Sequence, residues 1–197
     1  MIKVVGYVQG YVYDANTNKV LDNVIIRWEL PGGVADSTVA TAVDGFNISN
    51  LPSGNYYLKC SKANYATSVI QVDIPKDDIA VSVKGGGSKE FVVDVAPKLY
   101  SLGANATGRV YKLDDPIVAS VATPAVGAVV KLLYPFGNMV PNAYEAITDE
   151  NGYYTFEDVP SAGGTIMIAN YNSGDFSFFP YSNYYNFSGV SGTTFFY

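Results

Sequence analysis

Short stretches in which apolar and polar residues alternate recur along most of the chain. In residues 24–29, for example, Val24, Ile26 and Trp28 fall on one face of an extended segment, while Arg27 and Glu29 fall on the other. This period of two is typical of a half-buried β-strand. Gly, Pro, Asn and Asp separate the stretches, as they do at turns between strands. The pattern therefore predicts an all-β fold.

A second alternation, in residues 90–95, predicts another strand. Phe91, Val93 and Val95 should face a core, and Glu90 and Asp94 should face solvent. Helical periodicity is hard to find in the rest of the sequence.

The sequence also contains an internal repeat. The matching segments are 10–13 with 108–111, 23–27 with 127–131, and 51–53 with 159–161. The spacing between the copies changes only where turns are predicted, and surface turns tolerate insertions better than paired strands do. We therefore predict two tandem domains, residues 1–103 and 104–197.

Two corners of each copy carry recognisable motifs. One corner reads Asp44-Gly45-Phe46 in the first copy and Asp149-Glu-Asn-Gly152 in the second; the next reads Leu51-Pro52 and Val159-Pro160. These motifs resemble the carboxypeptidase regulatory-like module, a transthyretin-like β-sandwich that is also similar to the Cna B-type repeats of surface adhesins. The resemblance implies two tandem transthyretin-like (Ig-like) β-sandwiches. It implies no particular activity, because the module occurs as an appendage or stalk on many unrelated proteins.

The motif residues have structural roles by their chemistry. Asp can cap backbone N–H groups in a turn, Gly can adopt a positive φ, and Pro restricts φ at a corner. We therefore predict structural turn positions at Asp44, Gly45, Pro52, Asp149, Gly152 and Pro160.

Composition excludes several functions. The 197 residues include no histidine and a single cysteine, Cys60, so neither an imidazole base nor an intrachain disulfide is available. The net charge of -6 with scattered Lys and Arg argues against nucleic acid as a partner. No apolar run approaches the roughly 18 residues of a membrane span. Most Asp and Glu lie in predicted turns, so we expect no enzymatic activity and no cofactor.

One segment imitates part of a metal site. Asp14, Asn16 and Asn18 alternate as oxygen ligands do at the start of a calcium loop, although the later Gly and bidentate Glu of such a loop are missing. Calcium binding is one interpretation, and an Asx-rich hairpin turn is the other. We expect no other metal site.

The C-terminal segment is unusually rich in aromatic side chains. They could stack on the sugar rings of a glycan, pack against another subunit, or fill the core of the second domain. The candidate binding or contact residues are Tyr171, Phe176, Phe178, Phe179, Tyr181, Tyr184, Tyr185 and Phe187.

These observations favour a non-catalytic structural or adhesive protein that is extracellular, on the cell surface or in a virion. A cell-surface stalk or a phage decoration, tail or fibre component would fit, with other protein subunits or further copies of this chain as partners. Residues 1–10 lack the apolar segment of a secretion signal, which a virion protein would not need. The alternatives are a glycan-binding surface module that uses the C-terminal aromatics, or an accessory domain of a larger secreted enzyme or transporter.

Overall fold

The fold is all-β, as the alternation predicted. A computed structural model describes residues 3–76, 88–113, 122–170, 182–186 and 193–196, and every regular element within them is a strand. No helix in this described part could cross a membrane. The chain divides into two compact units, Met1–Ser101 with Asn138–Val140, and Leu102–Gly137 with Pro141–Tyr197.

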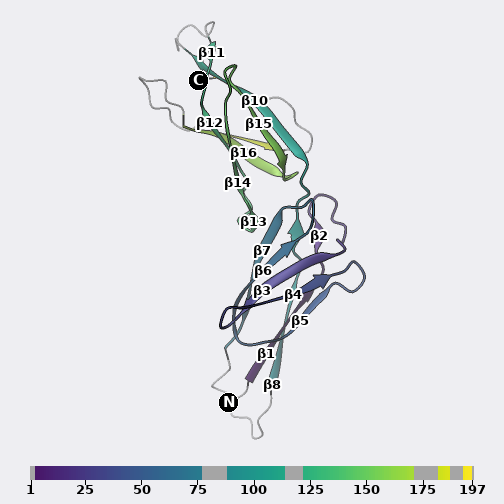
Figure 1. Cartoon of the computed structure of the whole chain (residues 1–197). Coiled ribbons are helices and arrows are strands. Elements are labelled where there is room, and N and C mark those ends of the chain that lie inside the picture. Colours follow the sequence, from purple (N-terminus) through teal and green to yellow (C-terminus); the bar gives the residue numbers. More distant parts are fainter. Residues whose placement is uncertain (1–2, 77–87, 114–121, 171–181, 187–192, 197) are drawn as a thin grey trace. The chain divides into compact units, whose positions relative to one another are not determined.

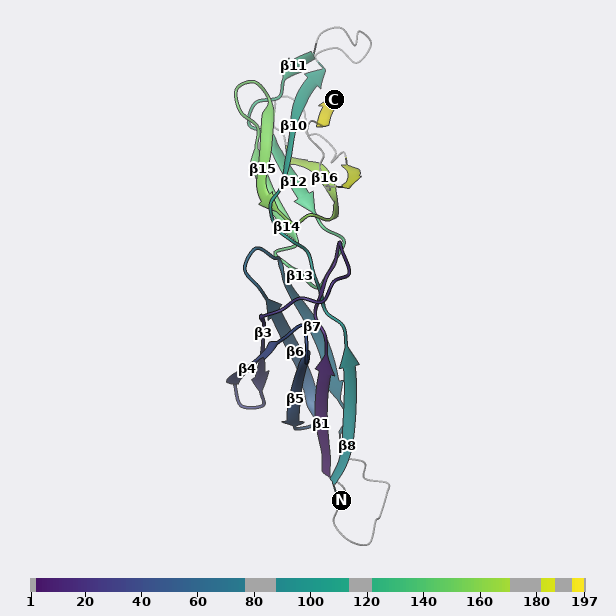
Figure 2. The ribbon, with the colours of Figure 1, turned by 90° about the vertical axis from the view of Figure 1, so that its right-hand side faces the viewer.

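The first unit contains two main sheets (Figure 1). In the smaller sheet, β1 (Lys3–Gly10) lies between β5 (Phe46–Leu51) and β8 (Ser88–Val95). Figure 2 shows β1 and β8 side by side and parallel, while β5 runs antiparallel to β1.

The larger sheet of the first unit has five strands in the order β13-β7-β6-β3-β4. Their bounds are β3 Val24–Leu30, β4 Val34–Ala40, β6 Gly54–Ser61, β7 Thr67–Ile74 and β13 Met139–Val140. A two-stranded parallel pair, β2 (Tyr13–Asp14) with β9 (Lys98–Leu99), completes the unit.

The hydrophobic core of the first unit draws on both main sheets, which makes the unit a β-sandwich. Val24, Ile26 and Trp28 of β3 are buried and Arg27 and Glu29 are exposed, as predicted. Complete burial of one such aliphatic side chain contributes about 1.5–3 kcal/mol. Other core residues are Val4, Val8, Phe46, Ile48, Leu51, Tyr56, Leu58, Cys60, Val72 and Ile74.

The prediction for residues 90–95 is only partly correct. Val93 and Val95 are half-buried against the core, but the side chain of Phe91 is 37% exposed. Among the described strands, β8 pairs with β1 alone and lies at the edge of its sheet, so fewer neighbours are available to cover Phe91.

The second unit also contains two sheets. In one, β10 (Ala104–Leu113) pairs with β11 (Ala122–Pro124) and β15 (Tyr153–Val159), and runs parallel to β18 (Thr193–Phe196). The other has the order β14-β12-β16-β17. Its strands are β12 Val129–Leu133, β14 Ala143–Ile147, β16 Gly163–Asn170 and β17 Ser182–Asn186.

The core of the second unit shows the same alternation of buried and exposed residues after its corner motif. Tyr154 and Phe156 on β15 are buried, and their rings make an edge-to-face contact with centroids 5.7 Å apart. Other buried residues of this unit are Val110, Ala128, Val130, Leu132, Tyr134, Val159, Ile166 and Ile168.

The two units have corresponding strand orders. The order β4-β3-β6-β7 in the first corresponds to β14-β12-β16-β17 in the second, and β5-β1-β8 corresponds to β15-β10-β18. The register agrees as well, because Gly10 pairs with Phe46 and Gly108 pairs with Tyr154. In both units the final strand of the sheet runs parallel to the first.

Candidate functional site

Asp14 forms the centre of a tight turn after β2. Its Oδ1 accepts hydrogen bonds from the backbone N–H of Asn16 at 2.9 Å, and from the backbone N–H and hydroxyl of Thr17 at 2.7 and 3.0 Å. Its Oδ2 accepts a hydrogen bond from the hydroxyl of Tyr65 at 2.9 Å. Both carboxylate oxygens of this buried side chain are therefore engaged by donors of the protein itself.

The electrostatics of Asp14 follow from these contacts. Burial alone would raise the pKa of Asp14, but the hydrogen bonds from Thr17, Tyr65 and Asn16 together outweigh it and hold the pKa below its ordinary value. Burial, and then the hydrogen bond to Asp14 and its charge, raise the pKa of Tyr65. At neutral pH Asp14 is thus ionised and accepts a hydrogen bond from the protonated hydroxyl of Tyr65.

The turn interpretation of the Asp14 segment accounts for these hydrogen bonds. Asn18 has a positive φ of 56° and donates its backbone N–H to the carbonyl oxygen of Asp14 at 2.9 Å. Among the described residues, no group of three Asp, Glu, His or Cys side chains could hold a metal ion. Calcium binding at Asp14, Asn16 and Asn18 stays a prediction.

Gly45 and Gly152 occupy positions that require glycine. Their φ values are +66° and +78°, in the left-handed region that other residues rarely adopt. A Cβ on Gly45 would overlap the carbonyl oxygen of Gly10, and one on Gly152 would overlap that of Val110. In each unit the turn thus lies directly against the backbone of the first long strand, β1 or β10.

The two turns are capped by different side chains. Asp149 Oδ1 accepts hydrogen bonds from the backbone N–H groups of Asn151 and Tyr153, each at 2.8 Å. In the first unit, Thr41 Oγ1 accepts a hydrogen bond from the N–H of Asp44 at 3.0 Å. The expected acceptor role of an aspartate side chain is therefore found at Asp149, whereas at the Asp44 turn the cap comes from a threonine.

The corners at Pro52 and Pro160 are each held by a tyrosine hydroxyl. Tyr56 donates to the carbonyl oxygen of Pro52 at 2.8 Å, and Tyr134 donates to that of Pro160 at 2.7 Å. The sequence predicted the prolines but not these partners. The available signal for these contacts was the tyrosine itself. When a tyrosine ring is buried and no polar residue lies nearby in the sequence, its hydroxyl still requires an acceptor.

The C-terminal aromatic residues lie mostly outside the described part of the chain. Tyr184 and Tyr185 belong to β17, whose backbone pairs with Thr165 and Gly164 of β16. The other candidates lie outside the described residues: Tyr171, Phe176, Phe178, Phe179, Tyr181 and Phe187. Their roles in glycan or subunit contact stay predictions.

An exposed edge strand is the feature of the first unit that sequence reasoning missed. β4 is the last strand of the five-stranded sheet, and six of its seven residues are exposed or only half-buried. Val34 is 61% exposed and Val39 is 49% exposed. Residues 34–40 contain a single charged residue, Asp36, which is few for an edge strand, so the sequence carried no signal of this position.

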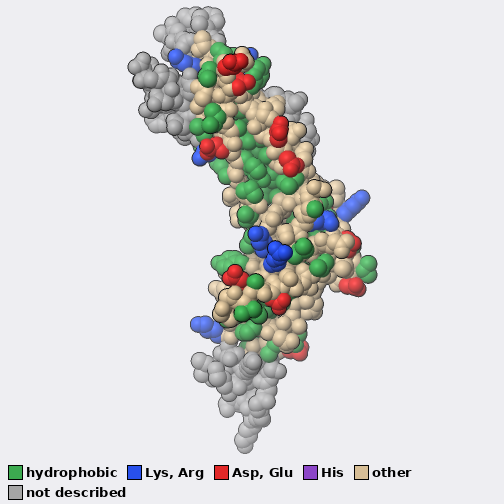
Figure 3. All heavy atoms as spheres, viewed as in Figure 1, with side chains coloured by type: hydrophobic (Ala, Val, Ile, Leu, Met, Phe, Trp, Pro, Cys, Tyr) green, Lys and Arg blue, Asp and Glu red, His purple; other side chains and the backbone are tan. Residues whose placement is uncertain are grey.

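Charges of both signs are interspersed over the described surface visible in Figure 3, and exposed hydrophobic side chains lie between them. In the second unit, the guanidinium of Arg109 lies 4.6 Å from the ring centroids of both Tyr111 and Tyr153. Lys131 and Glu145 form an ion pair at 3.3 Å on the surface of the same unit. Such exposed ion pairs typically contribute less than about 1 kcal/mol.

No family model matches the sequence, and no curated protein matches it. Three similar solved structures illustrate the range of the structural matches. A streptococcal ancillary pilin is 15% identical, with a TM-score of 0.46 over 98% of this chain and 62% of that one. The minor pilin GBS52 of Streptococcus agalactiae is 12% identical, with a TM-score of 0.45 over 98% of this chain and 94% of that one.

The third structure is the Bacillus anthracis TIE protein, which is 17% identical with a TM-score of 0.36. The match covers 98% of this chain and 33% of that protein. The chain therefore spans about a third of the length of the TIE protein, and 62% of the length of the ancillary pilin.

Proposed function

We propose that the protein is a non-catalytic structural subunit of an extracellular assembly, and that β4 forms a contact with a neighbouring subunit. The observation that carries the proposal is the open edge of the five-stranded sheet at β4, with Val34 and Val39 exposed. An edge strand presents unpaired backbone N–H and C=O groups, and soluble proteins usually protect such an edge with charges, prolines or bulges. Among the residues of β4, Asp36 alone supplies such a charge.

The architecture supports a structural role. We propose that the two units are copies of one transthyretin-like or carboxypeptidase regulatory-like module, divided near residues 103 and 104. The corresponding strand orders and the shared register of Gly10 and Gly108 support this division. Residues 138–140 are the exception, because they pair with β7 of the first unit.

The polar motif residues support a non-catalytic role. Asp14, Thr148 and Asp149 would be natural candidates for chemistry, but each forms hydrogen bonds that hold a turn. Burial raises the pKa of the Cys60 thiol to about 12, so the protonated, unreactive form dominates at neutral pH.

We place the assembly on a cell surface and retain a virion as the alternative location. In either setting the C-terminal aromatics would extend the subunit contact, with Tyr184 and Tyr185 on β17 as the residues to test. An accessory domain of a secreted enzyme or transporter is a third possibility, which association of the isolated chain in solution would disfavour.

Self-association measured by light scattering over a range of concentrations tests the β4 contact. We expect the wild-type chain to form larger particles as its concentration rises. The double variant Val34→Lys/Val39→Lys should weaken this association by about tenfold or more, because both substitutions place charge on the edge. Val126→Lys is the matched control, since Val126 is an exposed valine outside the strands.

Two results would contradict the proposal. One is a wild-type chain that stays monomeric at every concentration, alone and in the presence of its native assembly. The other is an equal effect of the β4 double variant and the Val126 variant. Association that survives the β4 changes but disappears in Tyr184→Ala/Tyr185→Ala would move the contact to the C-terminal segment.

A further inference from the structure

The five-stranded sheet of the first unit is split between β3 and β6. Their pairing covers three positions, from Ile25 with Ser61 to Arg27 with Lys59. By contrast, β3 stays paired with β4 as far as Leu30, and β6 stays paired with β7 as far as Gly54. The two hairpins therefore diverge beyond Arg27 and Lys59.

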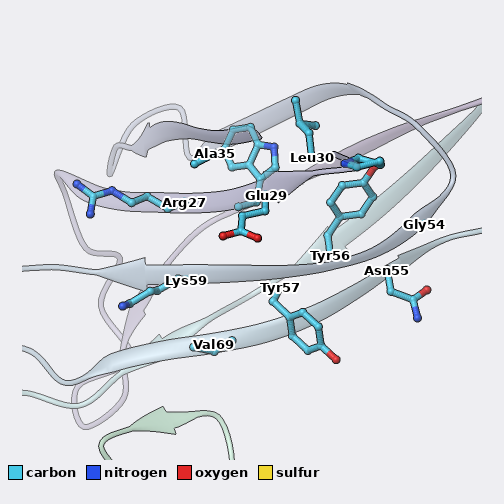
Figure 4. Close-up of a pocket in the computed structure, with 12 residues that line it drawn as sticks. Arg27, Glu29, Leu30, Ala35, Gly54, Asn55, Tyr56, Tyr57, Lys59 and Val69 are labelled. Atoms are coloured by element: carbon cyan, nitrogen blue, oxygen red, sulfur yellow. The ribbon is translucent and has the colours of Figure 1, made fainter. Parts of the chain in front are cut away.

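The divergence opens a groove of about 700 Å³. This size lies within the range of roughly 300–1,000 Å³ that is usual for small-molecule sites. Figure 4 shows the groove between the two strands, with Tyr56 and Tyr57 leaving β6 in opposite directions. Its walls combine residues of the inner and outer faces of the sheet, including Trp28, Leu30 and Tyr56 from the inner face and Glu29, Tyr57 and Lys59 from the outer.

Trp28 lines the inner wall of the groove. The side chain is 7% exposed, and its indole Nε1–H is buried without a hydrogen-bond partner. A buried donor without a partner destabilises the fold. The neighbouring Tyr56 hydroxyl, by contrast, is satisfied by the carbonyl oxygen of Pro52. The Trp28 residue therefore borders the groove, while its indole N–H is buried and out of reach of a ligand.

The outer wall of the groove offers further groups that the protein leaves unused. Arg27, Glu29, Asn55, Tyr57 and Lys59 form no hydrogen bond or ion pair through their side chains within the described part of the chain. Tyr57 is 62% exposed, so one face of its ring is available for stacking. Donors, acceptors and an aromatic platform thus line one cavity.

We propose that this groove binds a carbohydrate of one or two pyranose rings. A pyranose ring has apolar C–H faces that pack on an aromatic ring, and hydroxyl groups that both donate and accept hydrogen bonds. The carboxylate of Glu29 would accept from hydroxyls, while Arg27 and Lys59 would donate to them. A purely anionic ligand would offer no donor to Glu29, and a purely apolar one would leave all three charged groups without partners.

This proposal goes beyond the assembly role and is independent of the C-terminal aromatics. The groove is lined mainly by β3 and β6, with Ala35 of β4 and Val69 of β7, whereas the proposed subunit contact uses Val34 and Val39 of β4, which do not line the groove. The groove and edge variants can therefore be examined separately.

Trp28 is the single tryptophan of the chain, so its fluorescence reports on this groove alone. We would titrate the full chain with cellobiose, lactose and chitobiose while recording tryptophan emission. We expect at least one of them to produce a saturable change with a Kd of about 1 mM or below. Tyr57→Ala should weaken that binding about tenfold through loss of stacking, and Glu29→Gln should weaken it through loss of an acceptor.

Tyr153→Ala is the matched control, because Tyr153 is an exposed tyrosine of the second unit, and it should bind as the wild type does. Circular dichroism would verify that each variant is folded, and light scattering should show unchanged self-association for the groove variants. The proposal is overturned if no disaccharide gives a saturable change. It is also overturned if Tyr57→Ala and Glu29→Gln bind as the wild type does, or if an acetyl-blocked trialanine peptide saturates the signal and the sugars do not.

Discussion

The hydroxyl of Tyr65 donates a hydrogen bond to Oδ2 of Asp14 at 2.9 Å, although the two residues are 51 positions apart in the chain. The contact joins the turn after β2 to the segment that follows β6. It is a tertiary contact at a position where the sequence suggested only a local turn or a metal ligand.

We expect Asp14→Ala to lower the free energy of unfolding by about 1–3 kcal/mol, because it leaves the backbone N–H groups of Asn16 and Thr17 without their acceptor. Tyr65→Phe removes one hydrogen bond and should cost about 1 kcal/mol. Urea denaturation measures both values. Glu29→Gln, an exposed position in the same unit, is the control and should change stability little. An Asp14→Ala protein as stable as this control would contradict the structural role.

The lowered pKa of Asp14 predicts a specific pH dependence. Because the folded pKa lies below the ordinary value of about 3.9, the ionised carboxylate stabilises the native state. This contribution is fully present above about pH 5 and is lost as the pH falls through the folded pKa. Between about pH 5 and 2, the unfolding free energy of Asp14→Asn should therefore fall less steeply than that of the wild type. Identical slopes would show that the carboxylate is not stabilised by folding.

Replacing turn glycines by alanine should lower the stability of the protein by amounts that depend on the space around each glycine. Gly45→Ala and Gly152→Ala should each destabilise the protein by about 2–4 kcal/mol, because both an unfavourable φ and an overlap with a carbonyl oxygen result. Gly33→Ala is the matched control: its φ is +80°, but a Cβ there meets nothing within 4 Å. It should lose only about 1–2 kcal/mol, measured by thermal or urea denaturation. Equal losses at Gly33 and Gly45 would refute the overlap argument.

The buried thiol of Cys60 should be unreactive in the native protein. With a pKa of about 12, its thiolate fraction at pH 8 is about a thousandfold below that of a free cysteine. The Ellman reagent should therefore react very slowly under native conditions and should detect one thiol per chain after denaturation. Fast, complete labelling of the native protein would mean that the strand carrying Cys60 opens readily.

The side chain of Thr148 should contribute to the stability of the second unit. Its buried hydroxyl donates to the carbonyl oxygen of Ala125 at 2.5 Å and accepts from the N–H of Ala128 at 2.8 Å. Thr148→Val keeps the shape but leaves both backbone groups unpaired, so we expect a loss of about 1–3 kcal/mol in unfolding free energy. Thr155→Val, on the exposed face of β15, should be close to neutral. If both variants were neutral, water would have to replace the hydroxyl.

The sequence predicted those features that depend on local pattern. The buried residues of β3 followed from period-two alternation, because a strand presents alternate residues to one core. The same alternation buries Phe46 with Ile48 and Tyr154 with Phe156. The positive φ at Gly45 and Gly152 followed from turn chemistry in the same way.

Features that depend on which strands become neighbours could not be predicted. The exposure of Val34 and Val39 arises because β4 ends its sheet, and nothing in the residues of β4 specifies that position. The groove beside Trp28 arises where β3 separates from β6, and these strands are remote in sequence. The partner of Asp14 was missed for the same reason, since Tyr65 belongs to a distant segment.

The parallel pairing of first and last strands has a mechanical consequence. In the first unit, Lys3 pairs with Ser88 at one end of the ladder and Gly10 pairs with Val95 at the other. A pull between the start of β1 and the end of β8 therefore acts along the strands and shears all of their hydrogen bonds together, whereas an antiparallel pair pulled from one end would unzip bond by bond. The described part of the second unit has the same parallel arrangement, with pairing from Gly108 with Thr193 to Tyr111 with Phe196. Tension applied along either pair of parallel strands should therefore meet the combined resistance of its hydrogen bonds instead of breaking them one at a time.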